Sequence, residues 1–196
     1  MKLEEAGKYI LEKLKNGLPG QLSYHNAAHT IDVYNAADFI GKQENISDNE
    51  LTLLLTAALF HDSGYLIRAK GHELESCRIA KSALPDFGYN NEDIEQICGL
   101  IMATRLPQTP KNHLHEILAD ADLDYLGRDD FFEISELLYQ ENYFSGLLNN
   151  LEEWDQSQIA FIEKHKYFTK TAFNLREPLK KLNLQKIKAR LNVDLK

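Results

Sequence analysis

Cysteine is scarce in this chain of 196 residues. Only Cys77 and Cys98 occur, each within an apolar stretch, and the two are not in a Cys-x-x-Cys spacing. This pattern excludes a disulfide-stapled scaffold and a thiolate zinc site. It favours two free, buried thiols in a reducing compartment, so we expect a cytoplasmic protein.

Long hydrophobic runs are also missing. The longest, residues 53–60, is interrupted by Thr56 and is far too short to cross a bilayer. The residues that follow Met1, from Lys2 to Glu5, lack the apolar core of a signal peptide. We therefore expect no membrane partner.

Positive charge is in deficit, with 22 basic against 30 acidic residues and a formal net charge of -8. A nucleic-acid duplex or an anionic membrane requires a basic face, so neither is expected as the main partner. A small phosphorylated substrate remains compatible, because a metal ion and a few local cations can meet its charge. The length and the 43% hydrophobic share predict one globular domain over residues 1–196.

Apolar residues recur at helical spacing along the chain, and no stretch alternates convincingly as a strand does. Ser47 and Glu50 form the pattern of a capping box at the start of one helix. We therefore predict an all-α fold. The predicted helices cover about 3–15, 25–42, 48–60, 72–84, 94–104, 113–126, 131–138, 151–167 and 169–191.

The predicted helix that ends at residue 60 is apolar on nearly every side, which places it in the middle of the fold. It is followed directly by His61 and Asp62, which would therefore be delivered to the interior. An unpaired carboxylate buried there would cost several kcal/mol. A bound metal ion would remove that cost.

A second polar stripe lies in the segment from residue 24 to 33. If it is helical, His25 and His29 lie one turn apart and Asp32 follows on the next turn. Neutral imidazole and ionised carboxylate are the ligands that a divalent transition metal prefers. Asp32 could orient a ring N–H of His29, or it could cap or pair elsewhere.

Asp120 and Asp122 lie in a predicted helix that is otherwise apolar. Acidic residues in such a helix resemble buried ligands, although a solvated face would account for one of the two. The residues alone do not decide which of them faces the interior.

Three candidate ligand positions follow one another on separate predicted helices: His29, then His61-Asp62, then Asp122. This ordered set resembles that of the HD domain superfamily of metal-dependent phosphohydrolases. The resemblance covers about residues 24–127, with residues 128–196 as peripheral helices. Within the superfamily, residues 24–33 are similar to the signature Tyr-His-Asn-x-x-His-Ala-x-Asp-Val of cyclic-nucleotide phosphodiesterases, from which Thr30 departs. The resemblance implies an HD-domain, phosphodiesterase-like helical bundle.

Residue by residue, the resemblance implies that His29, His61, Asp62 and Asp122 bind a divalent metal ion, whether Mg, Mn, Ni, Fe or Zn. Asp122 is preferred as the last ligand because it stands in an Ala-Asp-Leu context. Asp120 remains the alternative. His25 matches the residue that protonates the leaving oxygen in the phosphodiesterases, and a structural or capping role is its alternative.

The implied activity is hydrolysis of a phosphate ester, such as a nucleotide phosphomonoester or a cyclic or other phosphodiester. Hydroxide on the metal, which is held in part by Asp62, would attack phosphorus, and nearby cations would meet the charge on the phosphate oxygens. His72 is a further candidate, as a ligand of a second ion or as a phosphate contact. The cations considered are Arg68, Lys70, Arg105 and Lys111.

Two other functions fit the same pattern. A dinuclear-iron oxidoreductase of the HD type needs additional histidines, and Thr104-Arg105 stands where some relatives carry one. A non-catalytic, nucleotide-sensing HD domain would have no need of a proton donor at His25. Homodimerisation is also open, because no sequence feature specifies an interface.

Overall fold

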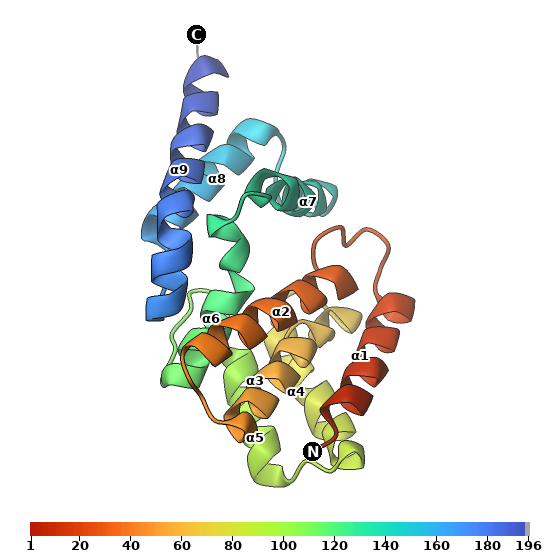
Figure 1. Cartoon of the computed structure of the whole chain (residues 1–196). Helices are drawn as coiled ribbons and strands as arrows, with labels where there is room; N and C mark the ends of the chain where they lie inside the picture. Colours follow the sequence, from red (N-terminus) through yellow and green to blue (C-terminus); the bar gives the residue numbers. More distant parts are fainter. Residues whose placement is uncertain (195–196) are drawn as a thin grey trace.

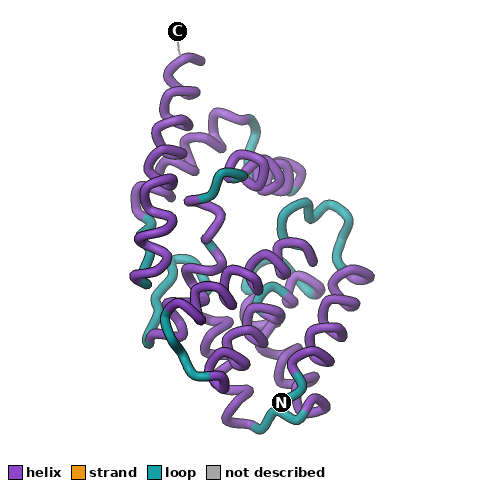
Figure 2. Tube along the Cα trace, in the orientation of Figure 1, coloured by secondary structure: helices purple, strands orange, loops and turns teal. Residues whose placement is uncertain are grey.

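The computed structural model describes residues 1–194, and all regular elements within that range are helical (Figures 1 and 2). The predicted all-α class is therefore confirmed. The α-helices are α1 (Leu3–Gly17), α2 (Ala27–Gln43), α3 (Asp48–Phe60), α4 (His72–Ala83), α5 (Asn91–Ala103), α6 (His113–Asp122), α7 (Phe131–Phe144), α8 (Leu151–Lys164) and α9 (Lys170–Asp194). Short 3₁₀ helices lie at Ser63–Leu66 (η1), Leu84–Phe87 (η2) and Asp124–Gly127 (η3).

Helix α3 lies at the centre of the lower part of the molecule in Figure 1, where it packs against α1, α2, α5 and α6. The predicted capping box is present: Ser47 accepts from the backbone of Glu50, and Glu50 accepts from the backbone of Ser47. Every residue from Leu53 to Phe60 is buried. Burial on all sides explains why this helix shows no polar face in the sequence.

The buried apolar residues form two clusters. The larger cluster contains residues from each of the helices α1 through α6. The smaller one contains Tyr24 and residues of η3, α7, α8 and α9 (Figure 1). Asp124 of η3 accepts two hydrogen bonds from Arg176 of α9, at 2.7 and 2.9 Å, which fixes α9 against η3. Residues of the smaller cluster line one cavity, and several of the polar residues singled out above, such as His25, Asp62 and Asp122, lie on its wall.

The second helix begins later than predicted. The side chain of Asn26 accepts hydrogen bonds from the backbone N–H groups of Ala28 and His29, so Asn26 caps α2 and the helix starts at Ala27. His25 consequently precedes the helix, and the predicted stripe that places it one turn from His29 is wrong. An asparagine cap satisfies the free N–H groups of the first helical turn, so the helix begins directly after it.

The sixth helix ends earlier than predicted. Instead of continuing to residue 126, α6 stops at Asp122, and Leu123 (φ -108°, ψ 18°) leaves the helical region before η3 begins. Asp122 therefore stands at a helix end, where its side chain is not confined to one face of a longer helix.

Gly64 allows η1 to lie directly on α4. A Cβ atom at Gly64 would come within 1.9 Å of the carbonyl oxygen of His72. The Gly64 N–H donates to Ser76 Oγ at 2.8 Å, and the Ser76 hydroxyl donates to the carbonyl of His61 at 2.6 Å. The glycine thus ties the end of α3 to the first turns of α4.

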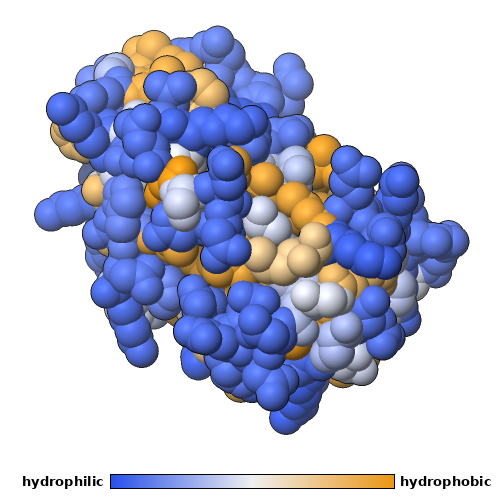
Figure 3. Space-filling model, turned by 60° about the horizontal axis from the view of Figure 1, so that its bottom comes forward, coloured by the Kyte–Doolittle hydropathy of each residue, from blue (hydrophilic) through white to orange (hydrophobic). Residues whose placement is uncertain are grey.

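Within residues 1–194, none of the helices has both the length and the apolar character needed to span a bilayer. The face shown in Figure 3 is mostly hydrophilic, with hydrophobic residues gathered towards its middle.

We expect Gly64→Ala to lower the free energy of unfolding by about 1–3 kcal/mol, because the added methyl group must push η1 away from the backbone of α4. Urea denaturation followed by circular dichroism measures this. Gly20→Ala is the matched control, since a Cβ there meets no atom within 4 Å. Equal stability of the two variants would contradict the close packing described.

Candidate metal centre

The end of α3 places two polar side chains in the interior. His61 is the residue that follows α3, and Asp62 comes directly after it. Both are buried. The Nδ1 atom of His61 donates to the carbonyl oxygen of Ala58 at 2.8 Å, so Nε2 is the nitrogen left with a free lone pair. Fixing the tautomer in this way prepares a histidine to bind a metal ion.

His29 from the first turn of α2 and Asp122 from the end of α6 complete the cluster. His29 Nε2 lies 3.4 Å from Asp62 Oδ2, 3.4 Å from Asp122 Oδ1 and 3.3 Å from His61 Nε2. His61 Nε2 lies 3.2 Å from Asp62 Oδ2 and 3.4 Å from Asp122 Oδ1. Four side chains from three parts of the chain thus point at one small volume.

These neighbours shift one another's pKa values. Burial alone would lower the pKa of His61, but the carboxylates of Asp62 and Asp122 raise it well above its ordinary value. Burial would raise the pKa of Asp122, but His29 and His61 bring it down to about 2. The pKa of Asp62 is likewise lowered against its burial, chiefly by His61. Without an ion, a proton on His61 therefore compensates the carboxylates of Asp62 and Asp122.

The donor set fits a divalent transition metal. One atom each of His29, His61 and Asp122 lies within 4.8 Å of the other two, and Asp62 adds a second carboxylate at the distances given above. Two imidazoles and two carboxylates match the preferences of Zn, Fe, Mn or Ni more closely than those of Ca. An ion at this point would replace the proton that His61 otherwise holds.

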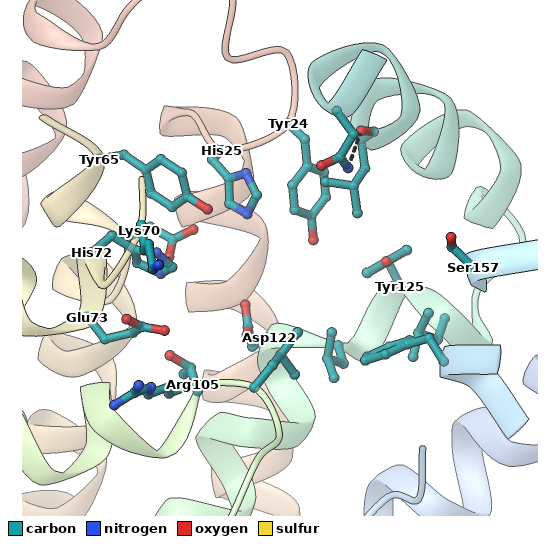
Figure 4. Close-up of a pocket in the computed structure, with 18 of the residues that line it drawn as sticks. Tyr24, His25, Tyr65, Lys70, His72, Glu73, Arg105, Asp122, Tyr125 and Ser157 are labelled. Carbon is teal, nitrogen blue, oxygen red and sulfur yellow. Dashed lines mark hydrogen bonds and ion pairs between the residues drawn. The ribbon is translucent and has the colours of Figure 1, made fainter. Parts of the chain in front are cut away.

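Two aromatic rings extend the cluster on the side of α4. His72 Nε2 lies 3.1 Å from Asp62 Oδ1, and its Nδ1 donates to the carbonyl of Ala69 at 3.0 Å. The ring of Tyr65 stacks between His25 and His72, with centroids 4.3 Å from each (Figure 4). His72 therefore lies at the far oxygen of Asp62, and its role as a ligand of a second ion or as a phosphate contact stays a prediction.

His25 is held by a residue that sequence reasoning missed. Its Nδ1 atom contacts Glu141 of α7 at very short range. The other Glu141 oxygen accepts from the backbone N–H groups of Tyr24 and His25, each at 2.9 Å. Burial would raise the pKa of Glu141, but these hydrogen bonds lower it. Helix α7 carries three glutamates, and nothing in the sequence distinguishes Glu141 from the others.

Two acidic residues that the sequence singled out have their partners outside the cluster. Asp32 accepts two hydrogen bonds from Arg128, at 2.7 and 2.8 Å, in place of orienting His29. Asp120 is buried and accepts from the backbone N–H groups of Phe168 and Thr169 and from the Thr169 hydroxyl. Burial raises its pKa to about 6 against these hydrogen bonds. Of the two aspartates of α6, Asp122 is the one that joins the histidines.

The cluster opens into a cavity of about 840 Å³. Of the four predicted cations, Arg68, Lys70 and Arg105 line it, and Arg68 also contacts Glu75 at 2.5 Å. Lys111 lines a separate hollow with Cys98 and therefore does not reach the same cavity. The prediction that Lys111 faces the phosphate is thus not supported by its position.

Glu73 is a second cavity residue that the sequence did not single out. It is 7% exposed, and its Oε2 atom has no hydrogen-bond partner among the described residues. It projects into the cavity on the side of Arg105 and His72 (Figure 4). In the sequence it is one of two acids in the first turn of α4, a place where acids are common at helix starts.

We expect the affinity for Mn²⁺ to fall as the pH is lowered and binding to release protons, because the ion must displace the proton that His61 holds. Titration calorimetry from about pH 8 to about pH 6, in buffers of different ionisation enthalpy, measures both effects. An affinity independent of pH and buffer would contradict this description of the cluster.

The family model for the HD domain matches residues 26–125, which contain all four clustered side chains. Among curated proteins, an uncharacterized protein of Clostridium beijerinckii (strain ATCC 51743 / NCIMB 8052) is 34% identical over 76 residues. The match covers 37% of this chain and 48% of that protein, so the chain matches about half the length of this relative.

Two solved structures share the fold over almost the whole chain. One is a predicted HD superfamily hydrolase from an uncultured Thermotogales bacterium, at TM-score 0.63 and 20% identity, with 94% of this chain and 91% of that chain covered. The other is YpgQ of Bacillus subtilis in complex with ADP, at TM-score 0.67 and 19% identity, with 98% and 97% covered. Because the matched model spans half of the sequence and the metal cluster lies inside it, this chain belongs to the HD domain family.

Proposed function

We propose that the protein is a metal-dependent hydrolase of a phosphate ester, with a nucleotide as its substrate. The observation that carries the proposal is the placement of His25, Asp62 and Asp122 on the wall of one cavity, with His29 and His61 directly behind the two carboxylates. A metal-binding cluster and a separate imidazole thus face the same space. Hydrolysis requires that combination, whereas binding alone does not.

His29, His61, Asp62 and Asp122 would hold the ion. A divalent cation in such a site lowers the pKa of a water molecule and polarises a phosphoryl oxygen. The phosphate itself meets Arg68, Lys70 and Arg105, which line the same cavity and supply positive charge where the transition state spreads negative charge over the phosphoryl oxygens.

The remaining proton transfer falls to His25. Glu141 accepts from its Nδ1–H, so the Nε2 atom is the one available to protonate the leaving oxygen. Stacking against Tyr65 fixes the plane of the ring. Glu141 is a positioning residue in this scheme, because it acts only through the imidazole.

The nucleotide is favoured by the rest of the cavity. Beyond the polar end, the wall is formed by apolar and aromatic side chains, which suit a flat ring. These side chains belong to Tyr125, Leu126, Leu138, Trp154, Phe161 and Ile162. The Bacillus subtilis protein, which has a similar fold, is in complex with ADP in its structure. Comparing the hydrolysis of nucleotides with that of cyclic nucleotides distinguishes a monoester from a diester substrate.

We expect metal-stripped protein, reloaded with Mn²⁺, Mg²⁺, Ni²⁺ or Fe²⁺, to hydrolyse nucleotides or cyclic nucleotides with at least one ion. His61→Gln removes one imidazole and should abolish both stoichiometric metal content and turnover. Phosphate release measures turnover, and elemental analysis measures the metal content. The matched control is His113→Gln, since His113 is half exposed and its ion-pair partners among the described residues are Glu44 and Glu116, outside the cluster.

Equal turnover of the His61 and His113 variants would contradict the proposal. Stoichiometric metal binding without turnover on any substrate would replace it with a nucleotide-sensing domain. Oxygen consumption by the iron-loaded protein would replace it with an oxidoreductase.

We expect His25→Gln to lower kcat by roughly 10²–10⁴-fold while metal content and KM stay near those of the wild type. Glu141→Gln should lower kcat by a smaller factor, because the imidazole of His25 is kept. An unchanged kcat in the His25 variant would remove His25 from the chemistry.

A further inference from the structure

The two cysteines of the chain lie opposite each other on neighbouring helices. Cys77 belongs to α4 and Cys98 to α5, and both are free thiols. Cys77 Sγ lies 3.5 Å from the carbonyl oxygen of Cys98, and Cys98 Sγ lies 3.7 Å from the carbonyl oxygen of Cys77. Because a cysteine side chain is short, these reciprocal contacts require a close approach of the two backbones. A close approach is also the condition for a disulfide.

A hollow in the surface leads to this pair of thiols. Its volume is about 700 Å³, and Cys98 lines it together with Met102 and the exposed Lys111. The hollow is distinct from the larger cavity, although Arg105 lines both. Cys77, on α4, is not part of its wall. A small polar molecule in the hollow would therefore meet Cys98 first.

The two thiols differ in how readily they ionise. The hydrogen bond with the Cys77 thiol lowers the pKa of Cys98, and Lys81 acts in the same direction, against the burial of the sulfur. The same hydrogen bond raises the pKa of Cys77, as does burial. Lys81 Nζ lies 2.6 Å from Glu95 Oε1, so this cation is held between α4 and α5 beside the pair. Because the thiolate is the reactive form, Cys98 is the nucleophile of the two.

We propose that Cys77 and Cys98 form a site of reversible oxidation, at which hydrogen peroxide that enters the hollow converts the two thiols into a disulfide between α4 and α5. The Cys98 thiolate attacks one peroxide oxygen and the O–O bond breaks. A sulfenic acid forms, and the departing hydroxide takes up the proton that Cys98 released. The Cys77 thiol then attacks the Cys98 sulfur, the S–O bond breaks, and water leaves with the proton of that thiol. Two thiols thus lose two electrons, and the peroxide is reduced to two molecules of water.

The disulfide would join two helices that supply residues to the larger cavity. Helix α4 begins with His72, whose Nε2 atom lies 3.1 Å from Asp62 Oδ1. Helix α5 ends at Ala103, shortly before Arg105, which lines the cavity. The pair therefore lies between the two helices behind that part of the wall. The inference does not rest on the proposed function, since the oxidation needs no substrate of the hydrolase.

The experiment counts the thiols of the full chain before and after treatment with hydrogen peroxide. Because the chain has 2 cysteines, every result can be assigned to a residue. We expect the unfolded, reduced protein to react with N-ethylmaleimide at both thiols. The oxidised protein should react at neither, and its mass should be lower by about 2 Da for the two hydrogens lost. Dithiothreitol should restore both thiols, and peptide mapping should find residues 77 and 98 in one cross-linked fragment.

Two matched variants separate the roles of the thiols. Cys77→Ser leaves Cys98 without a second thiol to attack its sulfenic acid, so we expect that acid to accumulate and to react with dimedone. Cys98→Ser leaves Cys77, which should stay unmodified at the same peroxide concentration. Circular dichroism shows whether each variant is folded, and the thiol count of the wild type stands without them.

Two free thiols in the wild type, after the same peroxide solution has oxidised glutathione, would overturn the inference. A disulfide that links two chains, instead of residues 77 and 98 of one chain, would overturn it as well. So would a wild-type protein in which Cys98 stays a sulfenic acid, because Cys77 would then be out of reach.

Discussion

The structure depends on two carboxylates that require positive charge. Asp62 is buried and Asp122 is largely covered, and both contact His29, so a carboxylate held there without compensation would cost several kcal/mol. His61 supplies that compensation when it carries a proton, and a divalent ion would supply it more fully. The cluster is therefore costly to keep as mere scaffold and is well suited to hold a metal.

The surrounding fold serves to bring these groups together. Helix α3 is buried along its last two turns and carries His61 and Asp62 inward, while α6 stops at Asp122 so that its carboxylate reaches the same point. The second apolar cluster adds what the first lacks, because α7 supplies Glu141 behind His25 and α8 supplies the aromatic end of the cavity. The cavity thus has a charged end and an apolar end, formed by different parts of the chain.

Much of the bundle could be predicted from the sequence because helical spacing and caps are local signals. The helix that runs to Phe60 and its capping box were predicted correctly. The grouping of His61 with Asp122 came instead from the resemblance to a family, and the two side chains lie 3.4 Å apart. Helix ends were predicted less well. The cap at Asn26 depends on whether its side chain turns back on the helix. Helix α6 ends where η3 begins, and Asp124 of η3 is bound by Arg176 of α9.

Contacts between distant segments left no signal in the sequence. Glu141 lies 116 residues from His25, and the pairing of Asp32 with Arg128 spans 96 residues. Asp120 and Asp122 lie on the same helix and differ in the direction in which each side chain points. The backbone N–H groups of residues 168 and 169 donate hydrogen bonds to Asp120. Choosing between such residues requires the tertiary arrangement, because the residue types are the same.

The most direct measurement is anomalous X-ray diffraction from crystals of the protein grown with Mn²⁺. The account predicts one strong anomalous peak with His29, His61, Asp62 and Asp122 as its protein ligands, each with an atom at about 2.0–2.2 Å. A peak at another site, or a fully occupied peak that Asp122 does not contact, would contradict it.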